Sequence, residues 1–412
     1  MRQSEAYLDI VWKQFKKNRI AHASLLLLLP LFFVAVLAPA IASNQPFIFV
    51  DGNDTLYPWF RAAMNPDEPV DFAFNMAMFA FPVWLVLATV TNVRWKKRGM
   101  PGRKRVGYVA LQYVVLSGLL IVIFSIPAFR PKNKYRTRTF AAEQFSSPET
   151  KHGVYPLIPF GPTEQDTDAI YRGPMFRKDQ TGWQESNDGF LHLLGTDDTG
   201  RDVLVQMIYG ARISMTVGFV AVGLYIVIGT ILGALAGYYG GRTDMLISRI
   251  IEIVLLFPAF FLILTMVALI GPSIYIIMVV IGVTRWPTIA RLIRGEVLKQ
   301  REIDYTYAAR SLGATHGRII FRHILPNAIS PALVAAPFGI ASAIITEAGL
   351  SLLGFGVRPP TPSWGTLLKL GNGNYNYWWL IVFPSVAIFF AVTIFNLVGS
   401  GLRDAMDPRL RV

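Results

Sequence analysis

The sequence predicts an all-α, polytopic membrane protein with about eight transmembrane helices. Of its 412 residues, 53% are hydrophobic and only 16% are charged, whereas a soluble chain carries about 25% charged residues. Several apolar runs reach the roughly 20 residues that a helix needs to cross about 30 Å of hydrocarbon. The chain contains no cysteine, which excludes disulfide scaffolding, thiolate metal sites and cysteine nucleophiles.

The expected membrane spans are separated by loops of very different lengths. In order, the eight spans are residues 24–42, 72–91, 107–127, 213–236, 250–270, 274–294, 328–348 and 378–400. The first span follows a basic segment, residues 1–23, and also fits a cleaved secretory signal peptide. We favour a retained signal-anchor.

The distribution of the 39 Lys and Arg residues predicts the orientation of these spans. With a cytoplasmic N-terminus, 25 of the 39 fall on inside segments, and 11 of the others lie in the long segment 128–212. Segments of that length are translocated largely regardless of charge. We therefore expect a multi-pass protein of the cell (inner) membrane with both termini cytoplasmic, residues 128–212 external (periplasmic), and membrane lipids as neighbours. Nucleic acid is not an expected partner, because the basic loop 94–105 lacks base-reading side chains.

Motifs for chemistry are absent from the chain. It contains no GxxxxGK[ST] phosphate loop, no HExxH and no GxSxG, and its five histidines are far apart in the sequence. We therefore expect no catalytic residue, no metal site and no bound cofactor in this chain. A carrier or pore subunit fits this composition better than a membrane-embedded enzyme.

The most informative segment follows the sixth span. The sequence from Asp304 to Gly313 predicts a short helix with Asp304 as N-cap and Gly313 just past its end. A second helix is expected from Thr315, stopped by Pro326. Helical spacing puts one set of side chains on a common face, namely Tyr305, Ala308, Ala309 and Leu312. An amphipathic helix lying on the bilayer is the alternative interpretation.

This segment resembles the EAA loop of permease subunits of bacterial ABC importers. The matching residues are Ala308-Ala309, Gly313 and Leu325-Pro326. Further motifs resemble the second permease of dipeptide and oligopeptide importers; they occupy residues 194–204, 209–214, 236–241, 319–327, 347–351, 359–365 and 401–409.

The resemblance implies a six-helix permease core to which an extra N-terminal hairpin has been added. The permease domain would occupy residues 213–412 with its EAA loop at about 295–326, preceded by the span 24–42 and by a segment, 43–127, that holds an external loop and the hairpin. The implied partners are a second permease subunit, two ATP-binding subunits that bind ATP and Mg, and an external solute-binding protein. A secondary transporter or channel is the alternative, but such a protein has no ATPase to dock.

The implied ATPase-coupling residues lie in the EAA loop; they are Tyr307, Ala308, Ala309, Leu312, Gly313, Leu325 and Pro326. Tyr307 stands where the family motif has glutamate. An aromatic contact or a hydroxyl hydrogen bond is therefore expected there in place of a charge-assisted contact.

Two charged residues are expected on the substrate pathway. Arg285 lies about 16 Å into the sixth span at 1.5 Å per residue, and a charge at that depth costs about 2.5–3.5 kcal/mol, so we expect it to face the pathway or a partner. Glu347, near the external end of the seventh span, is expected to pack the external gate. The charged run Asp197 to Asp202 is expected to cap the fourth span, Pro258 to kink the fifth, and Trp364, Trp378 and Trp379 to form an aromatic belt.

Overall fold

The computed structural model describes residues 7–135, 140, 151–177 and 191–407. Within these residues, seven helices are long and apolar enough to cross a membrane, and one bent helix pair adds an eighth span if it is counted as one. The N-terminal half contains α1 (Tyr7–Lys17), α2 (Arg19–Val36), α3 (Ala38–Ile41), α4 (Pro58–Ala63), α5 (Pro69–Lys97) and α6 (Gly102–Ser125). The expected all-α polytopic architecture is confirmed.

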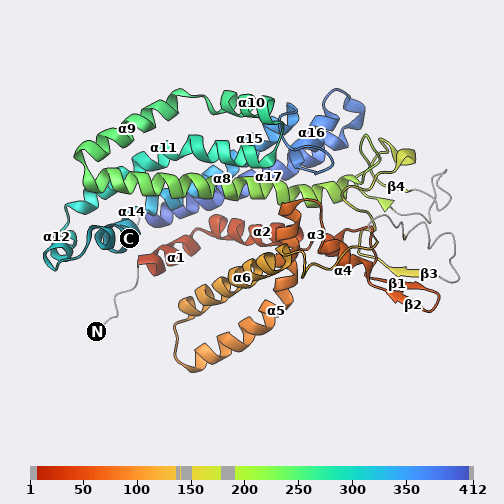
Figure 1. The fold of residues 1–412 in the computed structure, drawn as a ribbon, viewed down its shortest axis with the longest axis horizontal. Helices are drawn as coiled ribbons and strands as arrows, with labels where there is room; N and C mark the ends of the chain where they lie inside the picture. Colours follow the sequence, from red (N-terminus) through yellow and green to blue (C-terminus); the bar gives the residue numbers. More distant parts are fainter. Residues whose placement is uncertain (1–6, 136–139, 141–150, 178–190, 408–412) are drawn as a thin grey trace.

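The remaining long helices form a bundle in the C-terminal half, which runs across the upper part of Figure 1. They are α8 (Val203–Tyr239), α9 (Gly241–Leu256), α10 (Ala259–Ile270), α11 (Ile274–Arg301), α15 (Ser330–Leu352) and α17 (Trp379–Met406), with the shorter α16 (Trp364–Gly371).

Helices α8 and α11 approach each other closely along a row of glycines. A Cβ atom at Gly229 would lie 2.7 Å from the carbonyl oxygen of Trp286, and one at Gly233 would lie 2.5 Å from that of Ala290. Gly237 continues the row one turn later. Small residues four apart let helix backbones meet in a membrane, so this repeat specifies the central helix pair of the bundle.

The fifth expected span, residues 250–270, is broken. Helices α9 and α10 meet at an angle of 72° around Phe257 and Pro258. Proline donates no backbone hydrogen bond and disfavours helical geometry in the residue before it. The expectation of a kink at Pro258 is confirmed, and the break divides the expected span into two helices.

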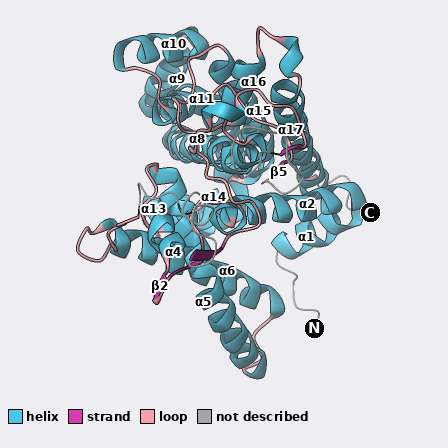
Figure 2. Ribbon diagram, turned by 90° about the vertical axis from the view of Figure 1, so that its right-hand side faces the viewer, coloured by secondary structure: helices cyan, strands magenta, loops and turns pink. Residues whose placement is uncertain are grey.

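Helices α5 and α6 form a hairpin that projects from the bundle (Figures 1 and 2). We call it the N-terminal hairpin. Many of its apolar side chains are exposed, including Val86, Leu119 and Val122. Such a surface fits contact with lipid chains.

The two ends of the molecule differ in structure. One end, which we call the strand end, carries an antiparallel sheet of order β2-β1-β3, built from Asp54–Leu56, Ile48–Asp51 and Lys151–Val154, and the short pair β4 (Phe176–Arg177) and β5 (Leu191–His192). The opposite end carries α12 (Asp304–Ser311), and we call it the α12 end (Figure 1).

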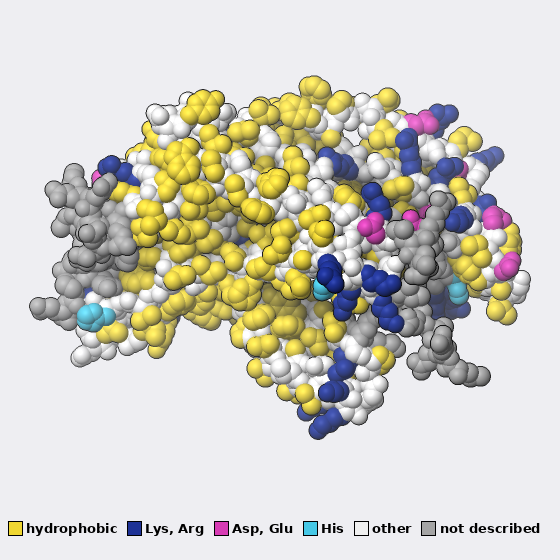
Figure 3. All heavy atoms as spheres, turned by 180° about the vertical axis from the view of Figure 1, so that it is seen from behind, with side chains coloured by type: hydrophobic (Ala, Val, Ile, Leu, Met, Phe, Trp, Pro, Cys, Tyr) yellow, Lys and Arg dark blue, Asp and Glu magenta, His cyan; other side chains and the backbone are white. Residues whose placement is uncertain are grey.

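Helix α1 packs on the last helix, α17, near the α12 end. Val11 and Phe15 are buried in the same apolar cluster as Ala405, and the side chain of Asn18 donates a hydrogen bond to Asp404 (3.4 Å). Between the two ends, apolar side chains cover the middle of the face in Figure 3, while Lys and Arg gather at the α12 end and at the tip of the N-terminal hairpin.

Candidate functional site

The short helix α12 stands on the end of α11 and turns two of its side chains inward. Thr306 and Ala309 are buried, whereas Ala308 is exposed and Leu312 is 88% exposed. The expected common face of Tyr305, Ala308, Ala309 and Leu312 is therefore wrong, because Ala309 packs against the protein while Ala308 and Leu312 face away from it. An outward apolar edge remains.

The boundaries of α12 differ slightly from expectation. Ile303 occupies the N-cap position and Asp304 lies in the first turn, where a carboxylate still favours the helix N-terminus. Gly313 follows the C-cap with φ of +78°, a left-handed conformation that glycine adopts without steric cost. This part of the sequence prediction is confirmed.

The segment after α12 does not stop at Pro326. A short helix, α13 (His316–Arg318), leads into the π-helical turn η2 (Ile319–Ile324) and then α14 (Leu325–Ala328). Pro326 lies in the first turn of α14, where a missing N–H costs little, so the expected helix end is wrong. The exposed Pro326 and half-buried Leu325 sit above three buried isoleucines, Ile319, Ile320 and Ile324.

Tyr307, at the position of the family glutamate, is linked to the carboxylate of Glu302, the C-cap residue of α11. Its hydroxyl donates a hydrogen bond to Glu302, which also accepts one from Arg301 Nε at 2.8 Å. The bond from Tyr307 lowers the pKa of Glu302 and raises the pKa of Tyr307. The loop therefore still presents an exposed carboxylate, supplied five residues earlier.

Further hydrogen bonds attach α12 to the membrane helices. Thr306 Oγ1 donates to the carbonyl oxygen of Gln300 (2.9 Å), and the Tyr305 hydroxyl donates to the Gln300 side chain (2.6 Å). Tyr238 at the end of α8 contacts His316 Nδ1 through its hydroxyl at 2.8 Å. These contacts connect α12 to α11, and α13 to α8.

The two expected pathway residues lie on neighbouring helices of the bundle. Arg285 of α11 is half-buried and donates through Nη1 to Ser342 Oγ of α15 at 2.6 Å. Glu347 of α15 is fully buried and accepts hydrogen bonds from Ser214 of α8 (3.1 Å) and from Ser351 (2.8 Å). Arg285 thus joins α11 to α15, and Glu347 joins α15 to α8.

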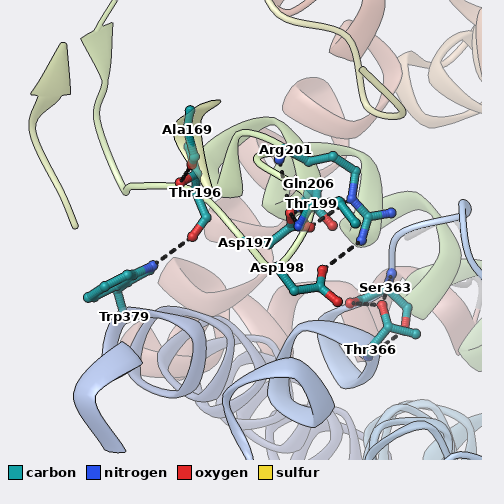
Figure 4. A network of polar contacts seen from close by, with 10 residues as sticks. All are labelled: Ala169, Thr196, Asp197, Asp198, Thr199, Arg201, Gln206, Ser363, Thr366 and Trp379. Carbon is teal, nitrogen blue, oxygen red and sulfur yellow. Dashed lines mark hydrogen bonds and ion pairs between the residues drawn. The ribbon is translucent and has the colours of Figure 1, made fainter. Parts of the chain in front are cut away.

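A buried polar network precedes α8 at the strand end (Figure 4). Asp197 is its centre and accepts hydrogen bonds from Arg201 Nε (2.7 Å), Gln206 Nε2 (2.7 Å) and the backbone N–H of Thr199 (2.9 Å). Arg201 also lies 3.6 Å from Asp198, whose pKa is raised by burial and by the charge of Asp197. We call these residues the Asp197 network.

The residues that follow the network cap α8 as expected. Asp202 is the N-cap and accepts the N–H of Val205 at 2.8 Å, while its other oxygen contacts His192 Nδ1 at 2.8 Å. The expected aromatic belt is wrong for Trp364 and Trp379, because both are buried. The indole of Trp379 donates to the carbonyl oxygen of Thr196 (3.0 Å; Figure 4).

Sequence reasoning missed a second buried cation, Arg212 of α8. Its guanidinium donates to Asp71 (2.8 Å) and Asn75 (2.9 Å) of α5 and to the carbonyl oxygen of Ala35 (2.6 Å) in α2. Arg212 has no exposed surface and fastens the N-terminal hairpin to the core. The sequence offered one indication of this ion pair, an acidic residue, Asp71, near the start of an apolar span.

Among the residues that the structure describes, no three or more His, Cys, Asp or Glu side chains lie close enough together to bind a metal ion.

Comparison with known proteins identifies two matching families. Residues 229–412 match the family described as binding-protein-dependent transport system inner membrane component, and residues 6–59 match the N-terminal transmembrane domain of oligopeptide transport permease C.

Individual relatives agree with this match. The dipeptide transport system permease of Alkalihalophilus pseudofirmus is 43% identical over 53% of this chain and 73% of its own length. The oligopeptide transport system permease of Bacillus subtilis is 40% identical over 53% and 72%. A solved inward-facing MetNI methionine ABC transporter chain has 20% identity over 49% of this chain and 97% of its own, with a TM-score of 0.39. This chain therefore belongs to the binding-protein-dependent transport system inner membrane components, as a multi-pass permease component of a peptide-type ABC importer.

Proposed function

We propose that this chain pairs with a second permease subunit to form a translocation pathway that two ATP-binding subunits drive. Its cargo would be peptides or similar small solutes delivered by an external solute-binding protein, in line with the relatives named for dipeptide and oligopeptide transport. ATP and Mg²⁺ bind to the partner subunits, and this chain contributes no catalytic residue.

The outward edge of α12 is the observation that carries the proposal. Ala308 and Leu312 project from a helix that Thr306 and Ala309 anchor. A small residue beside an exposed leucine suits insertion into a groove of another subunit, because the alanine admits a close backbone and the leucine supplies apolar area. We assign ATPase contact to this edge, together with Tyr307, Gly313, Leu325 and Pro326 of the same surface.

The hydrogen bonds of α12 suggest how its movement reaches the pathway. A displacement of α12 pulls on Gln300 and Glu302 at the end of α11, and α11 carries Arg285. Since α11 packs on α8 over a row of glycines, the two helices would move as one body. Such a rigid-body switch between two access states is the form of coupling that we propose.

Arg285 and Glu347 are our candidates for the pathway itself. Arg285 keeps hydrogen-bonding capacity beyond its bond to Ser342, because a guanidinium has five N–H donors, and would contact a peptide carboxylate or carbonyl group. Glu347, held by serines from two helices, would pack the external gate. Replacing Arg285 with Gln and finding unchanged uptake would remove it from the pathway.

The proposed orientation puts the α12 end and both termini in the cytoplasm. The basic tip of the N-terminal hairpin and the basic α12 end then lie on the side that the positive-inside rule prescribes. The strand end, with residues 128–212, faces the outside, and residues 213–412 form the permease domain.

Co-purification tests the coupling assignment. Ala308→Trp places a bulky ring on the outward edge, and Ala110→Trp places the same ring on an exposed position of the N-terminal hairpin. We expect ATPase subunits to be lost from complexes that carry Ala308→Trp and retained in the matched control. Retention in both would refute the docking assignment, and uptake by the chain without any ATPase would favour a secondary transporter.

A further inference from the structure

The tip of the N-terminal hairpin gathers positive charge. Helix α5 ends at Lys97 and α6 begins at Gly102, so only residues 98–101 connect them. Gly99 turns the chain with φ of +72°, a conformation that glycine adopts without steric cost. The described basic side chains at this turn, which we call the basic tip, are Arg94, Lys96, Lys97, Arg98 and Arg105. They form one of the basic regions in Figure 3.

No acidic side chain balances the basic tip. The sequence contains no Asp or Glu between Asp71 and Glu143. Among the residues that the structure describes, none of the five basic side chains forms an ion pair. Four of them are exposed, and Arg105 is half-buried and donates to the neutral side chain of Asn92 at 3.1 Å. The tip therefore keeps a positive potential that attracts anions.

Apolar surface begins within a few residues of the basic tip. Val93, Val106 and Leu111 are exposed, and no residue of the apolar stretch of α6, Arg105–Ser125, is buried. Beside the charges, Trp95 of α5 and Tyr108 of α6 pack with ring centroids 5.3 Å apart. Trp and Tyr favour the boundary between lipid chains and water. The pair thus indicates that the tip lies at the level of the lipid headgroups.

The charge of the tip has a second explanation. Basic residues beside a span set its orientation during insertion, and that effect needs no lipid bound to the finished protein. The two explanations are separable, because an orientation signal has acted before the protein is purified. Lipid binding, in contrast, is a property of the folded complex and is measured on it directly.

We propose that the basic tip binds the headgroup of an anionic phospholipid whose acyl chains lie on the apolar surface of α6. Clusters of about four to eight Lys or Arg beside a membrane span are typical of sites for anionic lipids, and guanidinium groups bond well to phosphate oxygens. A phospholipid combines an anionic group with apolar chains, which matches a surface where charge and exposed Val106 and Leu111 adjoin. The proposal does not depend on the proposed transport function.

Lipid titrations of the full-length chain, purified with its co-expressed partner subunits, test this proposal. Native mass spectrometry measures the dissociation constants of phosphatidylglycerol, of phosphatidylcholine with the same acyl chains, and of glycerol 3-phosphate. We expect phosphatidylglycerol to bind about tenfold more tightly than phosphatidylcholine, whose choline group cancels the phosphate charge. Glycerol 3-phosphate should bind more weakly than phosphatidylglycerol, because it has no chains to cover the apolar surface.

Three variants locate the binding. Arg94→Gln/Arg98→Gln removes two charges from the basic tip, whereas Arg94→Lys/Arg98→Lys keeps both charges at the same positions. We expect the glutamine variant to weaken phosphatidylglycerol binding about tenfold and the lysine variant to stay within about twofold of the wild type. Arg249→Gln, at an exposed arginine of α9 that pairs with Glu252, should leave the binding unchanged.

Four results would overturn the proposal. Phosphatidylglycerol could bind no more tightly than phosphatidylcholine, or glycerol 3-phosphate could bind as tightly as the lipid, which would indicate a site for soluble anions. Binding could be unchanged in an Arg94→Gln/Arg98→Gln complex that retains the wild-type thermal stability. Finally, that variant could lose a partner subunit that the lysine variant retains, which would make the tip a protein interface.

Discussion

The charged networks at the strand end and at the α12 end of this permease lie in opposite environments. At the strand end Arg201 is buried and bonds to Asp197, and Arg212 is buried and bonds to Asp71. At the α12 end Glu302 and Arg310 are exposed around the half-exposed Tyr307. Buried charges require fixed partners, whereas exposed ones remain available to another subunit. The first end is therefore suited to holding the bundle together and the second to docking.

The largest effect in this comparison is expected for Arg212→Leu. The substitution leaves Asp71 near the hairpin junction without its cation, and breaking a buried ion pair costs about 3–5 kcal/mol. Thermal unfolding of the purified complex measures the loss. The double variant with Asp71→Leu should recover part of the stability, because no uncompensated charge remains. Equal stability of Arg212→Leu and the wild type would contradict the claim that Arg212 holds the N-terminal hairpin to the core.

Asp197→Asn tests the Asp197 network. Asparagine keeps the volume but weakens the charge-assisted bonds from Arg201 and Gln206, so we expect a loss of about 2–3 kcal/mol in unfolding free energy. Hydrogen exchange of residues 196–206 should rise in parallel. An unchanged exchange pattern would show that the network is not what orders the start of α8.

Tyr307→Phe should leave stability unchanged and affect coupling alone. The variant removes the hydroxyl that donates to Glu302 while keeping the ring on the docking surface. We expect solute uptake per ATP hydrolysed to fall roughly twofold. Tyr307→Glu, which restores the family residue, serves as the comparison variant. Its carboxylate repels that of Glu302 but offers the docking surface a charge of its own. Full coupling in Tyr307→Phe would show that the bond has no role in transmission.

The smallest effect on stability is expected at an ion pair whose two side chains are both exposed. Arg249 Nη1 lies 2.6 Å from Glu252 in α9, with the two side chains 72% and 52% exposed. Pairs of this kind contribute about 0–1 kcal/mol, so Arg249→Gln should move the melting temperature hardly at all. A loss of stability as large as that of Arg212→Leu would contradict the claim that buried charged pairs stabilise the protein more than exposed ones.

Sequence reasoning recovered the features that depend on local chemistry. The apolar runs located the spans, Gly313 marked the end of α12, and the charged run Asp197 to Asp202 marked the start of α8, because each follows from a residue's own hydropathy or backbone preference. The break at Pro258 was anticipated as a kink, but its 72° angle depends on how α9 and α10 pack.

Features set by contacts between distant residues escaped prediction. Ala309 faces inward and Ala308 outward because α12 is hydrogen-bonded to Gln300 at the end of α11. The spacing of residues in the sequence does not reveal that contact. Arg212 was counted among external basic residues, although it is buried against Asp71, 141 positions away in the sequence. The role of Tyr307 likewise depends on Glu302, whose carboxylate comes within reach only when α11 and α12 meet at a turn.

Site-directed crosslinking tests the docking assignment most directly, because the natural chain has no cysteine. A single cysteine is introduced at Leu312 on the outward edge of α12, or at Leu119 on the exposed face of the N-terminal hairpin. We predict that the Leu312→Cys chain crosslinks to an ATPase subunit in the active complex and that the Leu119→Cys chain does not. An active complex in which Leu312→Cys yields no crosslink to an ATPase would contradict the account.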